Sequence, residues 1–170
     1  MRDAAPLVAA LIARGLRVGT AESLTGGLIA ARLTAMAGAS ACVVGGFVTY
    51  TDAAKHALLG VERELLAVEG AVSEAVACAM ARGARARLGV DLAVSATGYA
   101  GPQAGPDGEV GLVWLAIASA GGVSARRYRF GGDRAAVRDA SVDAALALIA
   151  EAIGGGRQEN GGPEGPPSMT

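Results

Sequence analysis

One feature constrains the fold of this chain more than any other: the stretch Thr20-Ala21-Glu22-Ser23-Leu24-Thr25-Gly26-Gly27. Residues 16–20 before it have the pattern of a short strand, and residues 28–36 after it have the pattern of a helix. In open α/β sheets, the turn from a strand into a helix lies at the carboxyl end of the strand, where such proteins bind ligands. The stretch therefore predicts an α/β fold and a ligand site in the same place.

The residues of this turn suit a ligand that carries negative charge. A helix that starts here presents free backbone N–H groups and a partial positive charge, which favour a phosphate or a developing oxyanion. Gly26 and Gly27 allow a ligand to approach the backbone closely. The alternative is that Ser23 or Thr25 only caps the helix and that the glycines only form a tight turn.

The remaining pattern predicts one domain over residues 1–153. We expect further helices over 4–13, 52–59, 62–68, 73–88 and 133–153, further strands over 41–50 and 91–96, and a hairpin of 110–119 with 123–130. Asp52 is the expected cap of its helix. Because strands and helices alternate first and the hairpin comes late, the fold class predicted is a three-layer α/β/α sandwich around a mixed, mostly parallel sheet.

Two segments stand apart from this core. Residues 97–108 form a long Gly/Pro loop, and loops of that length inside a compact domain are usually functional or mobile. Residues 154–170 are rich in Gly, Pro and polar residues, which predicts a disordered tail.

Composition excludes several classes of function. The formal net charge of −1 gives no field that would favour nucleic acid. The chain has one histidine, His56, and two cysteines far apart in sequence, Cys42 and Cys78, so we expect no metal site and no cofactor. No uninterrupted apolar run is long enough to span a membrane, and no signal peptide opens the chain. The sequence predicts a soluble, cytoplasmic protein.

A serine nucleophile at Ser23 would need a base. His56 is one candidate, but it lies in an Ala/Leu-rich segment beside Lys55. Lys55 is the single lysine among fifteen Lys and Arg residues, and a desolvated lysine can give up its proton where an arginine cannot. The alternative for Lys55 is a solvated helix face.

Five other side chains are candidates for binding. Tyr50 and Tyr99 are two of the six aromatic residues, and each can stack on a flat ring or donate its hydroxyl. Thr97 follows a predicted strand and either orients a ligand or starts the loop. Arg134 and Arg138 lie in the first turns of a helix, where a cation opposes the helix dipole. An acidic partner or a bound anion would explain this placement more easily. The alternative is a plain surface role.

Six motifs occur in order along residues 8–153. They are Thr20–Gly27, Gly46–Tyr50 with Lys55 five residues on, Gly70–Glu74, Thr97–Pro102, Val110–Trp114, and Gly132–Arg134 with Arg138. Their order and spacing resemble the CinA C-terminal domain family, the nicotinamide-nucleotide amidohydrolases, and six ordered motifs are a specific signal. Two positions depart from the family pattern: Tyr99 replaces an aliphatic residue, and 107–110 lacks a Lys-Pro pair.

The resemblance implies hydrolysis of nicotinamide mononucleotide to nicotinate mononucleotide and ammonia, without a metal. It implies that Ser23 is the nucleophile, that Lys55 is its base, and that Tyr50 and Thr97 support them. The expected substrate-binding residues are Glu22, Thr25, Gly26, Gly27, Tyr99, Gly101, Arg134 and Arg138. We expect a homodimer that binds a pyridine nucleotide but neither nucleic acid nor membrane. The alternatives are a non-catalytic nucleotide- or phosphate-binding module and a competence-related adaptor.

Overall fold

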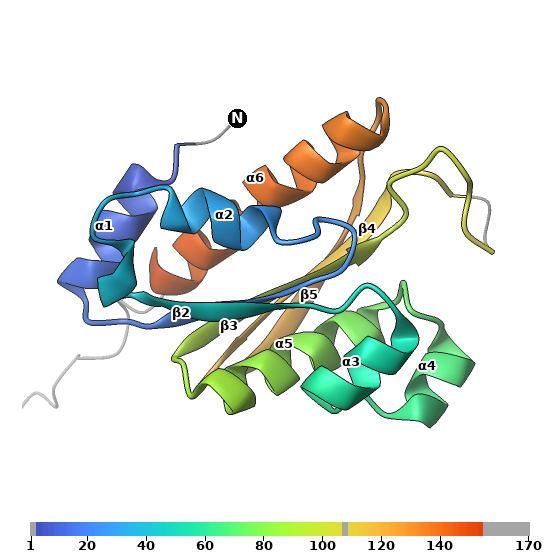
Figure 1. Cartoon of the computed structure of the whole chain (residues 1–170), viewed down its shortest axis with the longest axis horizontal. Helices are drawn as coiled ribbons and strands as arrows, with labels where there is room; N and C mark the ends of the chain where they lie inside the picture. Colours follow the sequence, from blue (N-terminus) through green and yellow to red (C-terminus); the bar gives the residue numbers. More distant parts are fainter. Residues whose placement is uncertain (1–2, 107–108, 155–170) are drawn as a thin grey trace, which may run out of the picture.

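The computed structural model describes residues 3–106 and 109–154 (Figure 1). Its central sheet has the strand order β2-β1-β3-β4-β5. The strands are β1 (Val18–Glu22), β2 (Val43–Val48), β3 (Leu92–Gly98), β4 (Leu112–Ser119) and β5 (Gly122–Arg129). The helices are α1 (Ala5–Ala13), α2 (Leu28–Thr34), α3 (Asp52–Leu59), α4 (Arg63–Glu69), α5 (Glu74–Leu88) and α6 (Arg134–Gly154), and a short 3₁₀ helix covers Ala39–Ala41.

The strand directions confirm a mixed α/β sheet. Strand β1 pairs in parallel with both β2 and β3, whereas β4 is antiparallel to β3 and β5 is antiparallel to β4. Four of the five strands therefore run in one direction, but the four neighbouring pairs divide evenly between parallel and antiparallel. The prediction of a mostly parallel sheet is confirmed for the strand directions, whereas only half of the strand pairings are parallel.

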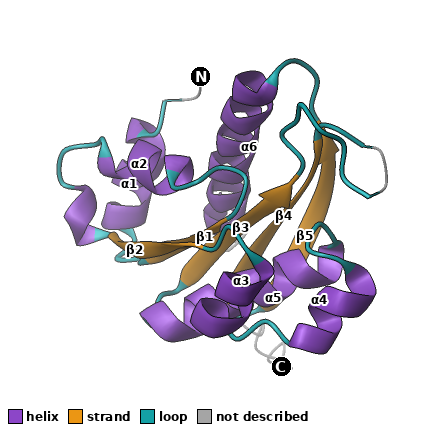
Figure 2. Cartoon of the chain, turned by 45° about the vertical axis from the view of Figure 1, so that its right-hand side comes forward, coloured by secondary structure: helices purple, strands orange, loops and turns teal. Residues whose placement is uncertain are grey.

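Helices cover both faces of the sheet, as the predicted sandwich requires (Figure 2). Helices α1, α2 and α6 lie on one face, and α3, α4 and α5 lie on the other. Successive side chains of a strand point to opposite faces, so Val18 of β1 joins the core under α6 while Ala21 joins the core over α5. Every residue of β1 is buried, which fits a strand between two helical layers.

The predicted boundaries are correct to within two residues, and some of the small differences matter. Strand β1 runs through Glu22, two residues beyond its predicted end, and β3 includes Thr97, which was expected to start the loop. The cap of α3 is Thr51, whose hydroxyl accepts the Ala54 N–H at 3.1 Å, and Asp52 is the first helical residue. The expected tail lies outside the described residues except for Gly154, which ends α6.

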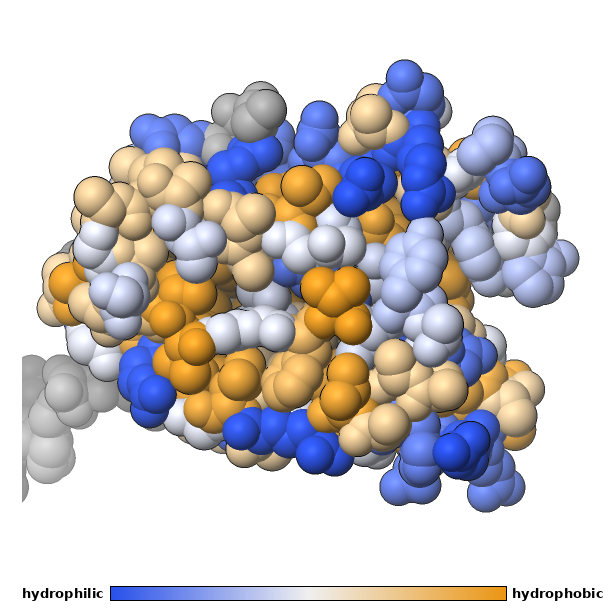
Figure 3. Space-filling model, in the orientation of Figure 1, coloured by the Kyte–Doolittle hydropathy of each residue, from blue (hydrophilic) through white to orange (hydrophobic). Residues whose placement is uncertain are grey.

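The two edges of the sheet differ in charge. Strand β5 carries Arg126, Arg127 and Arg129, and charged side chains on an edge oppose pairing with another chain. Strand β2 has no charged residue, and Val44 and Val48 on it are exposed. Figure 3 shows apolar side chains over the band where β2 runs in Figure 1, with the strongly hydrophilic residues mostly above and below it.

Candidate active site

A serine and a lysine meet at the carboxyl end of the sheet. The Ser23 N–H donates to the Ala96 carbonyl of β3 at 2.9 Å, which holds Ser23 directly beyond the end of β1. Lys55 lies on α3, and its Nζ is 3.3 Å from Ser23 Oγ and 3.1 Å from the Thr49 carbonyl oxygen. Only 8% of Ser23 and 2% of Lys55 is exposed, so this pair is shielded from water.

The surroundings of Lys55 favour its neutral form. Burial lowers the pKa of Lys55 because the low-dielectric interior disfavours the ammonium ion. The Asp52 carboxylate, with Oδ1 4.0 Å from Nζ, opposes this by raising the pKa, and the net direction is downward. Only the neutral amine can accept a proton from a hydroxyl, and lowering the pKa makes that form more accessible than in an ordinary lysine. This location rules out the alternative of a solvated helix face.

The pair opens into a cavity of about 190 Å³. Six of the predicted site residues line it: Ser23, Tyr50, Lys55, Thr97, Tyr99 and Arg134. The remaining lining residues are Leu24, Asp52, Ala71, Val72, Gly98 and Ala100. Its walls therefore come from the ends of β1 and β3, from α3 and its preceding loop, from the α4–α5 connection and from the start of α6.

Arg134 connects two of these walls. Its Nη1 donates to the Gly101 carbonyl at 2.8 Å, and its Nη2 donates to the Tyr50 hydroxyl at 2.7 Å. The loop before α3, the loop after β3 and the start of α6 are thereby tied together beside the cavity. Gly101 itself does not line the cavity and contributes through this carbonyl.

Glu22 does not face the cavity, in contrast to its predicted role in substrate binding. Its carboxylate accepts the backbone N–H groups of Gly27, Ile29 and Ala30 at 2.9–3.0 Å, and the residue is fully buried. Each hydrogen bond to a charged group stabilises a fold by roughly 1.5–3 kcal/mol. Three such bonds commit the carboxylate to the start of α2, where it also complements the helix dipole.

The other predicted residues of the turn, and Arg138, hold the backbone of the turn in place. Gly27 is the N-cap of α2 with φ +100°, a conformation that favours glycine. Arg138 donates from Nε to the Leu24 carbonyl and from Nη2 to the Thr25 carbonyl, at 3.0 and 3.2 Å. Neither Thr25, Gly26, Gly27 nor Arg138 lines the cavity, so their predicted contact with substrate has no support from the geometry.

Thr97 and Tyr99 are both fixed by neighbouring backbone. The Thr97 hydroxyl donates to the Ala71 carbonyl at 2.7 Å, which joins the end of β3 to the α4–α5 connection. The backbone of Gly105 packs on the Tyr99 ring, since a Cβ at Gly105 would lie 2.1 Å from Cζ. The described part of the loop after β3 thus shapes the cavity through Tyr99.

Sequence reasoning missed Asp52 as a site residue. It was interpreted only as a helix cap, yet it lines the cavity and lies close to Lys55. The available signal was its position three residues before Lys55 on a predicted helix, because residues at that spacing share a helix face.

His56, the other candidate base, points elsewhere. Its Nδ1 lies 2.9 Å from the Val61 carbonyl oxygen in the α3–α4 connection. In the described part of the chain, no group of three or more His, Cys, Asp or Glu side chains is placed to hold a metal ion. None of the described helices is long and apolar enough to cross a membrane.

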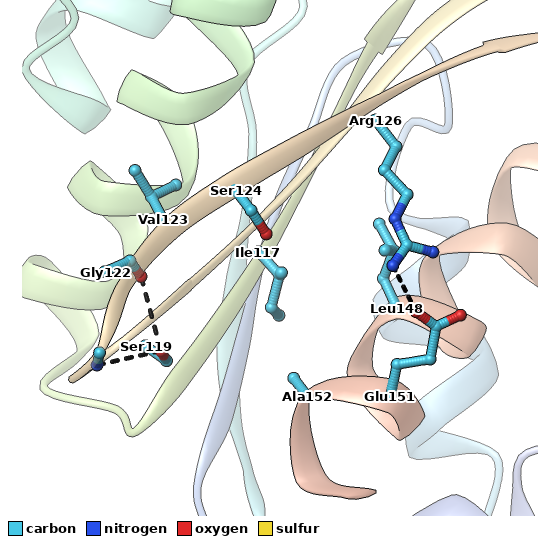
Figure 4. A pocket seen from close by; sticks show the side chains of 10 residues that line it. Ile117, Ser119, Gly122, Val123, Ser124, Arg126, Leu148, Glu151 and Ala152 are labelled. Atoms are coloured by element: carbon cyan, nitrogen blue, oxygen red, sulfur yellow. Dashed lines mark hydrogen bonds and ion pairs between the residues drawn. The ribbon is translucent and has the colours of Figure 1, made fainter. Parts of the chain in front are cut away.

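A larger hollow, of about 440 Å³, lies at the opposite end of the sheet (Figure 4). It is bordered by the β4–β5 turn and the end of α6, and Arg126 and Glu151 meet on it with Nη2 2.5 Å from Oε2. These two charges neutralise each other, and neither histidine nor lysine is among the described residues that line it. The smaller cavity is therefore the candidate active site.

Comparison with known proteins identifies the family. The CinA C-terminal domain model matches residues 2–153. A CinA-like protein of Geobacter sulfurreducens is 53% identical over 134 residues, which are 78% of this chain and 32% of that protein. A putative competence-damage inducible protein of Desulforamulus reducens is 49% identical over 138 residues, 81% of this chain and 34% of that protein. The chain spans about a third of the length of these relatives.

A solved structure agrees over nearly the whole fold. The crystal structure of the competence damage-inducible protein A (ComA) from Klebsiella pneumoniae has a TM-score of 0.87 and 44% sequence identity to this chain. The match covers 90% of this chain and 96% of that one. The chain therefore belongs to the CinA C-terminal domain family.

Proposed function

We propose that this chain is an amidohydrolase that deamidates a pyridine nucleotide, converting nicotinamide mononucleotide to nicotinate mononucleotide and ammonia. The observation that carries this proposal is the buried contact of 3.3 Å between Lys55 Nζ and Ser23 Oγ. A nucleophile with an adjacent base in a cavity is the arrangement required for acyl transfer.

In the proposed acylation step, neutral Lys55 accepts the Ser23 proton and Oγ attacks the carboxamide carbon. The tetrahedral intermediate collapses as the C–N bond breaks, and Lys55 returns the proton to the leaving nitrogen, which departs as ammonia. In deacylation, a water molecule attacks the ester carbon as Lys55 takes one of its protons. The bond between that carbon and Ser23 Oγ then breaks, Lys55 returns the proton to Oγ, and the carboxylic acid leaves. The step consumes one water and needs no metal or redox group.

The backbone around Ser23 offers donors for the oxyanion. The Gly26 N–H donates to the Ser23 carbonyl and the Gly27 N–H donates to Glu22, so these two amides are already committed. Among the described residues, the N–H groups of Leu24 and Thr25 have no protein acceptor. Leu24 lines the cavity, and its amide is our first candidate for stabilising the developing charge.

The other cavity residues take supporting roles in the proposal. Arg134 binds the phosphate, because its guanidinium is at the cavity and can offer further N–H donors beyond the two in use. Tyr50 and Tyr99 contact the nicotinamide ring, and Thr97 positions the wall at Ala71. Arg138 positions the turn that follows Ser23.

A second copy of the chain is the proposed protein partner. Strand β2 pairs with β1 on one side only, and residues 23–51 contain a single charged side chain, Arg32. An uncharged, apolar edge strand favours β-pairing with another strand, and a strand paired with its own copy satisfies both edges at once. Sedimentation should give a dimer for the natural chain and a monomer for Val44→Lys with Val48→Lys.

One set of experiments separates the amidohydrolase from two other functions. A nucleotide- or phosphate-binding module would use Arg134 without turnover, and an adaptor role is suggested by the competence names of the relatives. We would measure ammonia release from nicotinamide mononucleotide, free nicotinamide and simple amides. Release from the nucleotide that Ser23→Ala abolishes supports the amidohydrolase. Binding of the nucleotide without release would replace it with the module, and absence of both would favour the adaptor.

A further inference from the structure

The cavity carries opposite charges on different elements. Arg134, at the start of α6, supplies a guanidinium, and Asp52, at the start of α3, supplies a carboxylate. Asp52 is the one acid among the described lining residues, and its side chain is 59% exposed. A ligand that fills the cavity therefore meets a cation and an anion at separate places.

Asp52 works against the proposed base. Its carboxylate, 4.0 Å from Nζ, stabilises the ammonium form of Lys55, whereas catalysis needs the neutral amine. When Lys55 is neutral, no cation remains beside this carboxylate among the ion pairs of the described residues. The proton-transfer step does not require an acid at this position. A role for Asp52 in binding the ligand would account for it.

Two aromatic side chains line the same space. Tyr50 comes from the loop before α3 and Tyr99 from the loop after β3, and one part of the Tyr99 ring is packed against Gly105. Aromatic faces attract cations through the ring quadrupole, most strongly where the cation is partly desolvated. A carboxylate with two tyrosines is suited to a flat ring that bears positive charge.

We propose that Asp52 is a specificity residue, which makes this site discriminate an amide on a positively charged ring from the same amide on a neutral ring. The inference rests on the proposed function and narrows its substrate class. The N-substituted pyridinium of an oxidised pyridine nucleotide has this charge distribution. The dihydropyridine of the reduced nucleotide keeps the carboxamide and the phosphate but has no ring charge, so Asp52 gives it no advantage.

The test compares two probes that differ in ring charge. We would use the full chain with Ser23→Ala, so that ligand is not consumed, and measure dissociation constants of nicotinamide mononucleotide and its reduced form by calorimetry. The same pair is then measured after Asp52→Asn. The matched control is Glu64→Gln, which removes one negative charge from the exposed first turn of the neighbouring helix α4, outside the cavity.

We expect Asp52→Asn to weaken binding of the oxidised nucleotide about three- to fivefold, which is the contribution of a partly exposed charge pair. Binding of the reduced nucleotide should not change. Glu64→Gln should change neither. Equal weakening of both probes, or no change in their ratio, overturns the role of Asp52 while the amidohydrolase proposal stands. If the natural chain neither binds nor deamidates the oxidised nucleotide, the proposed function and this inference fall together. Thermal melts establish that each variant is folded.

Discussion

The two hollows at opposite ends of the sheet differ in what their charges do. In the larger one, Arg126 and Glu151 are both about half exposed and neutralise each other, an arrangement that costs the fold little. In the smaller one, a lysine is 2% exposed and has one carboxylate, 4.0 Å away, for a counter-ion. Burying an amine in this way is costly. The smaller cavity is therefore the better candidate for a catalytic site, and cavity volume is a poor guide to function in this protein.

The sharpest test of this contrast is to change the buried pair. Ser23→Ala and Lys55→Ala should each lower turnover about a thousandfold or more, and the double variant should be little worse, because the two residues act as one unit. Lys55→Arg should be as inactive as Lys55→Ala, since arginine keeps the charge but does not accept the proton. Ammonia release checks these values, and near-normal turnover in Lys55→Arg would exclude Lys55 as the base.

Lys55→Met separates catalysis from folding in that experiment. The pKa of Lys55 is lower in the folded than in the unfolded chain, so between the two pKa values the unfolded chain holds the proton more tightly. The free energy of unfolding should therefore rise with pH through this range and level off above the pKa of the unfolded chain. At neutral pH the buried amine therefore detracts from stability. We expect Lys55→Met to be inactive with a melting temperature no lower than that of the natural chain. A large drop in melting temperature would show that Lys55 serves the fold.

Arg134 should give the next largest effect. Arg134→Ala should raise the KM for nicotinamide mononucleotide about tenfold, because a charge-assisted hydrogen bond to phosphate is lost at a partly exposed site. The KM for free nicotinamide, which has no phosphate, should change little. Equal changes for both substrates would remove the phosphate role and leave Arg134 as a tie between Tyr50 and Gly101.

A smaller effect is expected in the pH profile. Turnover requires neutral Lys55, so kcat/KM should rise with pH through the pKa of that residue. Asp52→Asn removes the charge that raises this pKa, and the rising limb should move to lower pH by a fraction of a pH unit. Free nicotinamide is the substrate of choice here, because it keeps the ring charge out of the comparison. A shift to higher pH would contradict the assignment.

The larger hollow should give the smallest effect of all. Arg126→Gln combined with Glu151→Gln keeps both side chains polar and removes an exposed ion pair. Turnover should stay within about twofold and the melting temperature should not change measurably. A loss of activity as large as that of Arg134→Ala would show that this end of the sheet contributes to function.

The sequence allowed the fold to be predicted almost completely, because apolar periodicity and turn residues are local signals. The site was harder. Ser23 and Lys55 are 32 residues apart, so no local pattern joins them. The chemistry of the single lysine left Lys55 as one of two candidate bases, and the family resemblance favoured it before the structure placed Nζ beside Oγ. Glu22 was expected to bind substrate because β1 was expected to stop two residues early. Inside the strand, the pleat directs its carboxylate to α2, whereas in a loop it would have been free to meet a ligand.

The same carboxylate has a consequence for how this protein can diversify. In many α/β proteins the first turn of the helix holds the ligand's phosphate, and changing the ligand means rebuilding that backbone. Here Glu22 acts as a resident anion that occupies the helix end from within the fold. The cavity is lined instead by side chains from separate segments, such as Tyr50, Asp52 and Arg134, and we propose that these make the ligand contacts. A new ligand can then be accommodated by exchanging those side chains, with the turn and its serine kept intact.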